Sequence, residues 1–141
     1  MKLGALRYVC YDRAVRICLD LDGVICELRQ PGDSYADLQP VNGAVEAIRR
    51  LRRDGHYIII FTARHMATTG GNLGQVLARQ GEITLRWLSE HGVEYDEILF
   101  GKPFADIYID DNGFRFRSWD DALLRTHALP QSSESKVLEF E

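Results

Sequence analysis

Hydrophobic positions along the chain follow two patterns. Short, nearly continuous apolar runs, typical of strands buried on both faces, cover 15–21, 56–62, 96–101 and 105–111. Apolar residues recur at helical spacing in 44–53, in 72–91 with an expected break at Gly81, and in 119–129. This order of elements predicts an α/β fold: a Rossmann-like three-layer sandwich with a mostly parallel central sheet and helices on both faces.

Local signals support the ends of these elements. Gly55 and Gly92 are expected to stop two helices, because glycine accepts the left-handed conformation that follows a helix. Ser118 is expected to cap the last helix. The segments 23–40 and 63–74 are rich in glycine, proline or polar residues and are predicted to be loops.

Length and composition limit the class of protein. The 141 residues fit a single domain, which we place at 1–130, followed by a polar tail at 131–141 that we expect to be mobile. A net charge of −4 argues against a nucleic-acid-binding surface, and no apolar stretch has the length of a membrane span. Three cysteines, of which Cys18 is expected in the core, favour a reducing cytoplasm over a disulfide framework.

Chemically active side chains follow each predicted strand. In a parallel sheet ligands bind beyond the carboxyl ends of the strands. The residues at these ends are Asp20 and Asp22, Thr62, Lys102, and Asp110 and Asp111. Asp20 and Asp22 alone are also compatible with a surface turn. Chance would scatter such groups over the fold, so their shared position favours a functional site.

Carboxylates gathered without His or Cys suit a hard cation, and Mg²⁺ is the natural choice. A calcium-binding loop is the competing interpretation, but it requires glycine at its sixth position and Gly23 is fourth. Lysine and threonine would bind phosphate oxygens, so the set predicts a phosphoryl site. One of the paired acids could then attack phosphorus while the other acts as general acid and base.

The sequence resembles the haloacid dehalogenase-like hydrolases. "DLDGV" (20–24), the threonine of "FTAR" (61–64), the lysine of "GKP" (101–103) and "YIDDN" (108–112) match the four motifs of that superfamily in order. The resemblance implies that Asp20 is the nucleophile and Asp22 the general acid/base. It also implies that Thr62 and Lys102 bind phosphate. The implied Mg²⁺ site comprises Asp20, Asp22, Asp111 and Asp110, with Asp111 favoured as the direct ligand.

The resemblance also limits the branch of the superfamily. Branches that cleave other bonds differ at the position of Asp22, so a phosphomonoester hydrolase is favoured. Residues 24–40 and 63–80 are too short to hold the inserted cap domain of the superfamily, so we expect a single domain without a cap. The stretches "ARHMATTGGNLGQV" and "ILFGKP" are similar to small phosphatases of surface-polysaccharide (capsule) biosynthesis.

Several residues are expected to contact the substrate: Gly23, Thr62, Ala63, Arg64, Asn72 and Lys102. For Arg64 and His65 simple solvation in a loop is the alternative, and Asn72 could equally begin a helix.

The sequence thus predicts a cytoplasmic, Mg²⁺-dependent phosphatase that acts on a sugar phosphate or similar small metabolite. Phosphatases of macromolecules, whether nucleic-acid ends or phosphoproteins, and a non-catalytic binding module remain the alternatives. No nucleic-acid or membrane partner is expected. A homo-oligomer that covers the open site is possible.

Overall fold

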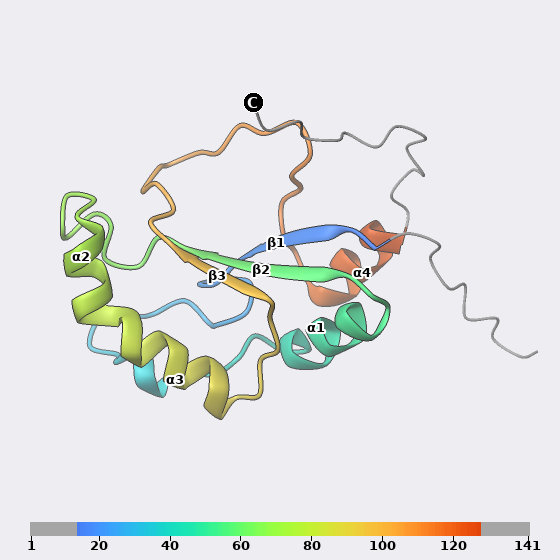
Figure 1. Cartoon of the computed structure of the whole chain (residues 1–141), viewed down its shortest axis with the longest axis horizontal. Coiled ribbons are helices and arrows are strands. Elements are labelled where there is room, and N and C mark those ends of the chain that lie inside the picture. The colour runs from blue at the N-terminus through green and yellow to red at the C-terminus, as the bar shows by residue number, and fades with distance from the viewer. Residues whose placement is uncertain (1–13, 128–141) are drawn as a thin grey trace, which may run out of the picture.

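The computed structural model describes residues 14–127 (Figure 1). The elements are β1 (Arg16–Asp20), η1 (Tyr35–Asp37), α1 (Ala44–Arg53), β2 (Tyr57–Thr62), α2 (Leu73–Val76), η2 (Leu77–Gly81), α3 (Glu82–Glu90), β3 (Glu97–Phe100) and α4 (Trp119–His127). The predicted tail at 131–141 lies outside the described residues. Within 14–127, no helix is both long and apolar enough to cross a membrane.

Three strands form a parallel sheet in the order β1-β2-β3. Asp20 at the end of β1 pairs with Phe61, and Thr62 at the end of β2 pairs with Phe100. The carboxyl ends of all three strands therefore lie at one edge. The predicted α/β fold with a parallel, Rossmann-like sheet is confirmed.

One face of the sheet holds the core. Ile58 and Ile60 of β2 are fully buried, whereas the residues that alternate with them along the strand are partly exposed. They belong to one apolar cluster with Ile48 of α1, Trp87 of α3 and Trp119 of α4. In Figure 1 these three helices lie on the same side of the sheet. The core is thus built between a sheet and one layer of helices.

The opposite face of the sheet carries no helix in the described part of the chain. Cys18 of β1 is exposed, and Leu99 of β3 is 42% exposed on a strand that the sequence predicts to be buried. The expectation that Cys18 is a core residue is therefore wrong. Of the three predicted layers, residues 14–127 form two.

The predicted fourth strand at 105–111 is wrong. Residues 101–118 contain no strand, and Ile107 and Ile109 are 74% and 93% exposed. In Figure 1 this segment runs from β3 to α4 on the side of the sheet that lacks helices. Strand-forming residues become a strand only when a neighbouring strand pairs with them, and sequence pattern alone does not supply that partner.

The helix after the glycine-rich loop does not break at Gly81. Gly81 keeps helical dihedral angles (φ −58°, ψ −58°), and η2 is a π-helical turn that joins α2 to α3. A π turn absorbs an extra residue without ending the helix, which is why the expected break does not occur. The predicted cap at Ser118 is confirmed, since its Oγ accepts from the N–H of Asp121. Asn72, expected as a substrate contact, takes the alternative role of beginning a helix, where its Oδ1 accepts from the N–H of Gln75.

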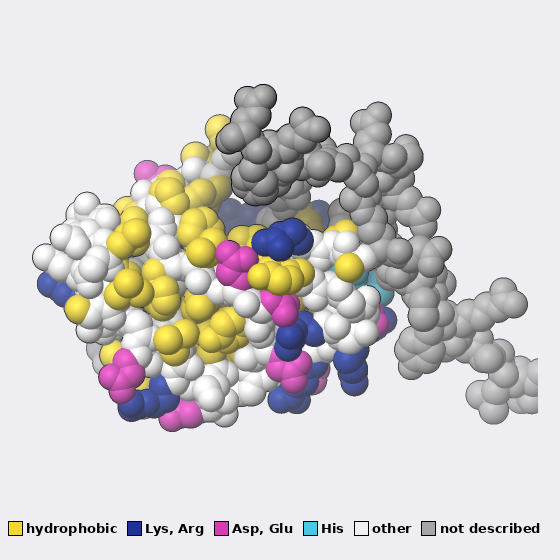
Figure 2. Space-filling model, in the orientation of Figure 1, with side chains coloured by type: hydrophobic (Ala, Val, Ile, Leu, Met, Phe, Trp, Pro, Cys, Tyr) yellow, Lys and Arg dark blue, Asp and Glu magenta, His cyan; other side chains and the backbone are white. Residues whose placement is uncertain are grey.

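Apolar surface is also exposed on the helices. Leu73, Leu77 and Leu85 are about half exposed. Figure 2 shows hydrophobic side chains gathered over the region of α2 and α3. The homo-oligomer expected from the sequence would cover such surface, and it stays a prediction.

Two isoleucines test this description of the fold. Ile60→Ala removes a fully buried side chain and should lower the free energy of unfolding by about 2–5 kcal/mol. Ile109→Ala truncates a side chain that is 93% exposed and should change it by less than about 0.5 kcal/mol. Denaturant unfolding of both variants measures the difference. An equally large loss in Ile109→Ala would mean that 105–111 is packed as a strand after all.

Candidate active site

The end of β1 places Asp20 beside a lysine from the end of β3. Asp20 Oδ2 lies 3.0 Å from Lys102 Nζ, and its Oδ1 accepts a hydrogen bond of 2.9 Å from the N–H of Leu21. Lys102 reaches this position through Gly101, which has a φ of +96°. A Cβ at Gly101 would come within 2.6 Å of Leu73, so this turn requires glycine. Two of the residues predicted to meet at the strand ends, Asp20 and Lys102, are therefore in contact.

Thr62 ends β2 between these groups. Its side chain is buried, and its Oγ1 accepts a hydrogen bond of 3.1 Å from the backbone N–H of Arg64. Its carbonyl oxygen accepts one of 3.1 Å from the N–H of Lys102. A hydroxyl that accepts one hydrogen bond can still donate its own proton, as binding of a phosphate oxygen requires.

Asp22 has a cation of its own. Arg64 Nη2 donates to Asp22 Oδ1 at 2.8 Å, and Arg64 Nε lies 3.2 Å and 3.0 Å from Oδ1 and Oδ2. The side chain of Arg64 is 0% exposed, whereas those of Asp22 and Asp20 are 24% and 39% exposed. Lysine and arginine thus offset the repulsion between the two acids that their spacing implies.

Three residues that surround the Arg64 guanidinium were not predicted as part of the site. The ring of Tyr35 lies 4.2 Å from the guanidinium carbon, and Thr84 Oγ1 accepts from Nη1 at 3.2 Å. Cys26 Sγ lies 3.5 Å from Nη2. Burial raises the pKa of the Cys26 thiol to about 11, so it is protonated and a poor nucleophile at neutral pH. No sequence spacing links these residues, which lie on separate elements.

His65 adopts a left-handed backbone conformation, with φ of +56°, that is uncommon for a residue other than glycine. Its ring nitrogen Nδ1 lies 2.9 Å from Thr68 Oγ1, and its carbonyl accepts a hydrogen bond of 2.7 Å from Thr69 Oγ1. Burial lowers the pKa of His65, and the charges of nearby arginines lower it further. The ring is therefore mainly neutral at pH 7.

The other expected substrate contacts have local roles in the structure. Gly23 N–H donates to the carbonyl of Cys26 at 2.7 Å, and Ala63 accepts from the N–H of Met66 at 3.0 Å. Asn72 caps α2. Arg64 points to Asp22 rather than to an open position. Substrate binding by these four residues stays a prediction.

The structure does not bring Asp110 and Asp111 to Asp20. Both are exposed, and Asp110 Oδ1 accepts a hydrogen bond of 2.9 Å from the N–H of Asn112 on its own segment. Residues 14–127 contain no cluster of three or more His, Cys, Asp or Glu side chains that could hold a metal. Asp20 still offers a partly exposed carboxylate, and Mg²⁺ commonly binds one or two carboxylates and completes its shell with water and phosphate oxygens.

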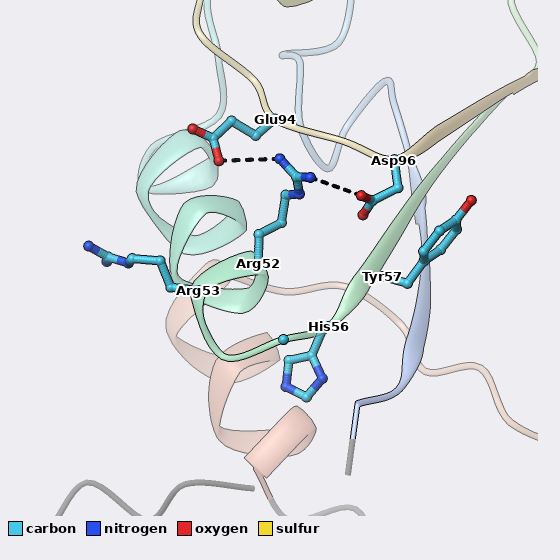
Figure 3. A pocket seen from close by; sticks show the side chains of 7 residues that line it. Arg52, Arg53, His56, Tyr57, Glu94 and Asp96 are labelled. Carbon is cyan, nitrogen blue, oxygen red and sulfur yellow. Dashed lines mark hydrogen bonds and ion pairs between the residues drawn. The ribbon is translucent and has the colours of Figure 1, made fainter.

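A separate hollow lies at the opposite end of the sheet, where β2 begins (Figure 3). Arg52 there bridges Glu94 at 3.5 Å and Asp96 at 2.8 Å. Asp96 also accepts from the N–H of Ile58 at 2.8 Å, and this bond, followed by that from Arg52, lowers the pKa of Asp96. These charges hold β2 and the segment before β3 to α1. The hollow contains none of the predicted site residues.

A comparison with solved structures finds a relative of similar length, whereas two other comparisons find no match. No family model and no curated protein matches the chain. A crystal structure of a target protein from Vibrio cholerae is 31% identical, covers 79% of this chain and 98% of that one, and has a TM-score of 0.66.

Two further structures match at lower levels. A D,D-heptose 1,7-bisphosphate phosphatase from B. bronchiseptica, complexed with magnesium and phosphate, is 21% identical over 81% of this chain and 64% of that one, with a TM-score of 0.44. The Pnkp1/Rnl/Hen1 complex is 23% identical over 70% and 30%, with a TM-score of 0.45. Likeness at this level carries no argument. The Vibrio cholerae protein is similar enough in sequence and in length to show kinship, and the chain belongs to the same family as that protein.

Proposed function

We propose that the chain is a Mg²⁺-dependent phosphomonoester hydrolase of the haloacid dehalogenase-like type that acts through an aspartyl-phosphate. The observation that carries the proposal is the contact of 3.0 Å between Asp20 and Lys102 at the strand ends, with Thr62 beside them and Asp22 two residues on. Three of the four motifs that resemble this superfamily meet at one edge of the sheet, which supports a common catalytic role.

In the first step a carboxylate oxygen of Asp20 forms a bond to phosphorus, and the bond from phosphorus to the leaving oxygen breaks. Asp22 gives a proton to that oxygen, so the leaving group departs as a neutral alcohol. In the second step water attacks the same phosphorus atom. Asp22 takes the proton of the water, and the bond from phosphorus to Asp20 breaks to restore the free carboxylate.

Lys102 and Thr62 bind the phosphoryl oxygens in this proposal. Lys102 also holds the Asp20 carboxylate in place, since it lies within ion-pair distance of it. Mg²⁺, when bound, supplies positive charge that offsets the repulsion between the carboxylates and a phosphate dianion. Asp20 would hold the ion together with Asp111 or Asp110, which would have to approach from their exposed segment, whereas both oxygens of Asp22 are bound by Arg64.

A small phosphorylated metabolite, such as a sugar phosphate, is the proposed substrate. The chain from β1 to α1 contains only the short helix η1, and the chain from β2 to β3 contains one helical stretch, which supports a site without a cap domain. The net charge of −4 disfavours a nucleic-acid substrate. The proposed role in surface-polysaccharide biosynthesis rests on the two sequence stretches alone. A screen of phosphorylated metabolites and phosphopeptides, with and without Mg²⁺, tests substrate class and activity together.

Removal of the metal should abolish phosphate release, because the acids otherwise repel the substrate. Excess chelator should stop turnover, and added Mg²⁺ should restore it. Asp111→Asn and Asp110→Asn should raise the Mg²⁺ concentration for half-maximal activity by about tenfold or more, with the larger effect at Asp111. Asp106→Asn, an exposed acid on the same segment, is the matched control and should change nothing. Full activity in chelator would contradict the metal assignment.

Variants of the two motif acids should fail at different steps. Asp20→Asn removes the nucleophile and should abolish turnover with every substrate. Asp22→Asn should slow turnover by about 10²–10⁴-fold, but less in the first step with nitrophenyl phosphate, whose leaving group needs little protonation. Acid-quenched Asp22→Asn enzyme should therefore carry labelled phosphate on Asp20, which peptide mapping detects. Label on another residue would refute the assigned roles.

A further inference from the structure

Each nitrogen of the Arg64 guanidinium has a polar partner. Two of its nitrogens bind Asp22, the third binds Thr84, and the ring of Tyr35 covers one face. The side chain is 0% exposed, although it extends from the loop that follows β2. A buried charge with no counter-charge would cost several kcal/mol, so Asp22 is the partner that allows Arg64 to be buried here.

The two ends of this ion pair lie in different surroundings. Arg64 is enclosed by Tyr35, Thr84 and Cys26, which come from three separate elements or loops. Asp22 keeps 24% of its side chain exposed at the edge where the strands end. A planar guanidinium binds a carboxylate in a fixed plane, unlike the flexible ammonium of lysine. Because the guanidinium of Arg64 is held in place, it fixes the direction in which the exposed side of the Asp22 carboxylate points.

The contacts hold both oxygens of Asp22. Oδ1 accepts from Nη2 at 2.8 Å, and Oδ2 accepts from Nε at 3.0 Å, while Nε also lies 3.2 Å from Oδ1. Two parallel N–H groups of one guanidinium therefore fix both oxygens in its plane, which is the geometry that makes arginine–carboxylate pairs directional.

We infer that Arg64 is a positioning residue for the general acid: its Nη2 and Nε hold the two oxygens of Asp22, so the carboxyl group is fixed in orientation at the edge where the strands end. This inference rests on the proposed function. In the first step the proton passes from the Asp22 carboxyl group to the leaving oxygen, and in the second the proton of water returns to that carboxyl group. Arg64 itself gains and loses no proton. Its backbone N–H binds Thr62 Oγ1 at 3.1 Å, so the same residue orients the phosphate-binding hydroxyl.

The test uses a series of phosphate monoesters whose leaving groups differ in pKa. Wild-type enzyme should show a shallow dependence of kcat/KM on leaving-group pKa, because Asp22 protonates poor leaving groups. Arg64→Met and Arg64→Lys should lower kcat for alkyl phosphates by about 10²-fold or more and affect nitrophenyl phosphate far less. The dependence then becomes steep. Guanidinium ion added to Arg64→Ala should restore part of the lost rate with alkyl phosphates.

Two further variants keep the test decisive. Thr84→Val removes one acceptor of the guanidinium at nearly constant volume, and it should steepen the same dependence by a smaller amount even if Arg64 variants fold poorly. Arg86→Met, on the same helix with a side chain 63% exposed, is the matched control and should match wild type. An equal loss with every leaving group would mean that Arg64 is only structural. Wild-type enzyme without Mg²⁺-dependent phosphate release would overturn the proposed function, and this inference with it.

Discussion

The parallel pairing of β1 with β2 is the constraint on which the site depends. The paired positions run from Arg16 with Tyr57 to Asp20 with Phe61, so the motif acid and Thr62 reach the same edge together. Ile58 and Ile60 point into the core and fix which face of β2 is buried. A shift of one residue would turn these side chains outward and Thr62 away from the site. The arrangement of Asp20 and Thr62 is thus stabilised by the burial of apolar side chains that lie outside the candidate site.

Charge is distributed in this site so that each acid has a different cation. Lys102, whose side chain is 16% exposed, pairs with the more exposed Asp20 at the edge where the strands end. Arg64 is buried and binds Asp22 from the interior of the protein. Breaking a fully buried pair of this kind costs about 3–5 kcal/mol, and less where one partner stays partly exposed, as Asp22 does. Because the buried charge of Arg64 needs the carboxylate of Asp22 as its counter-charge, the pair stays together and Asp22 is held in position.

The sequence predicted the features that local pattern determines. α1, the cap at Ser118 and the first three strands were predicted within a residue or two, because periodicity and capping chemistry act over a few positions. The meeting of Asp20 with Lys102 followed from parallel strand order. The contact between Arg64 and Asp22 joins the side chains of residues 42 positions apart, and no sequence pattern near either residue predicts it. The strand at 105–111 was wrong for the same reason, since a strand needs a distant partner.

The π turn at Leu77–Gly81 has a consequence for the direction of α3. Each residue of an α-helix rotates the next by about 100°, so one extra residue in a turn changes which side every later residue occupies. Thr84 lies three residues beyond this turn and reaches Arg64, while Trp87 and Leu88 fill the core. Removal of a single residue from the turn would swing all three off these positions at once. The length of this turn therefore sets the rotation of α3 about its axis. That rotation lets Thr84 contact Arg64 while Trp87 and Leu88 pack against the sheet.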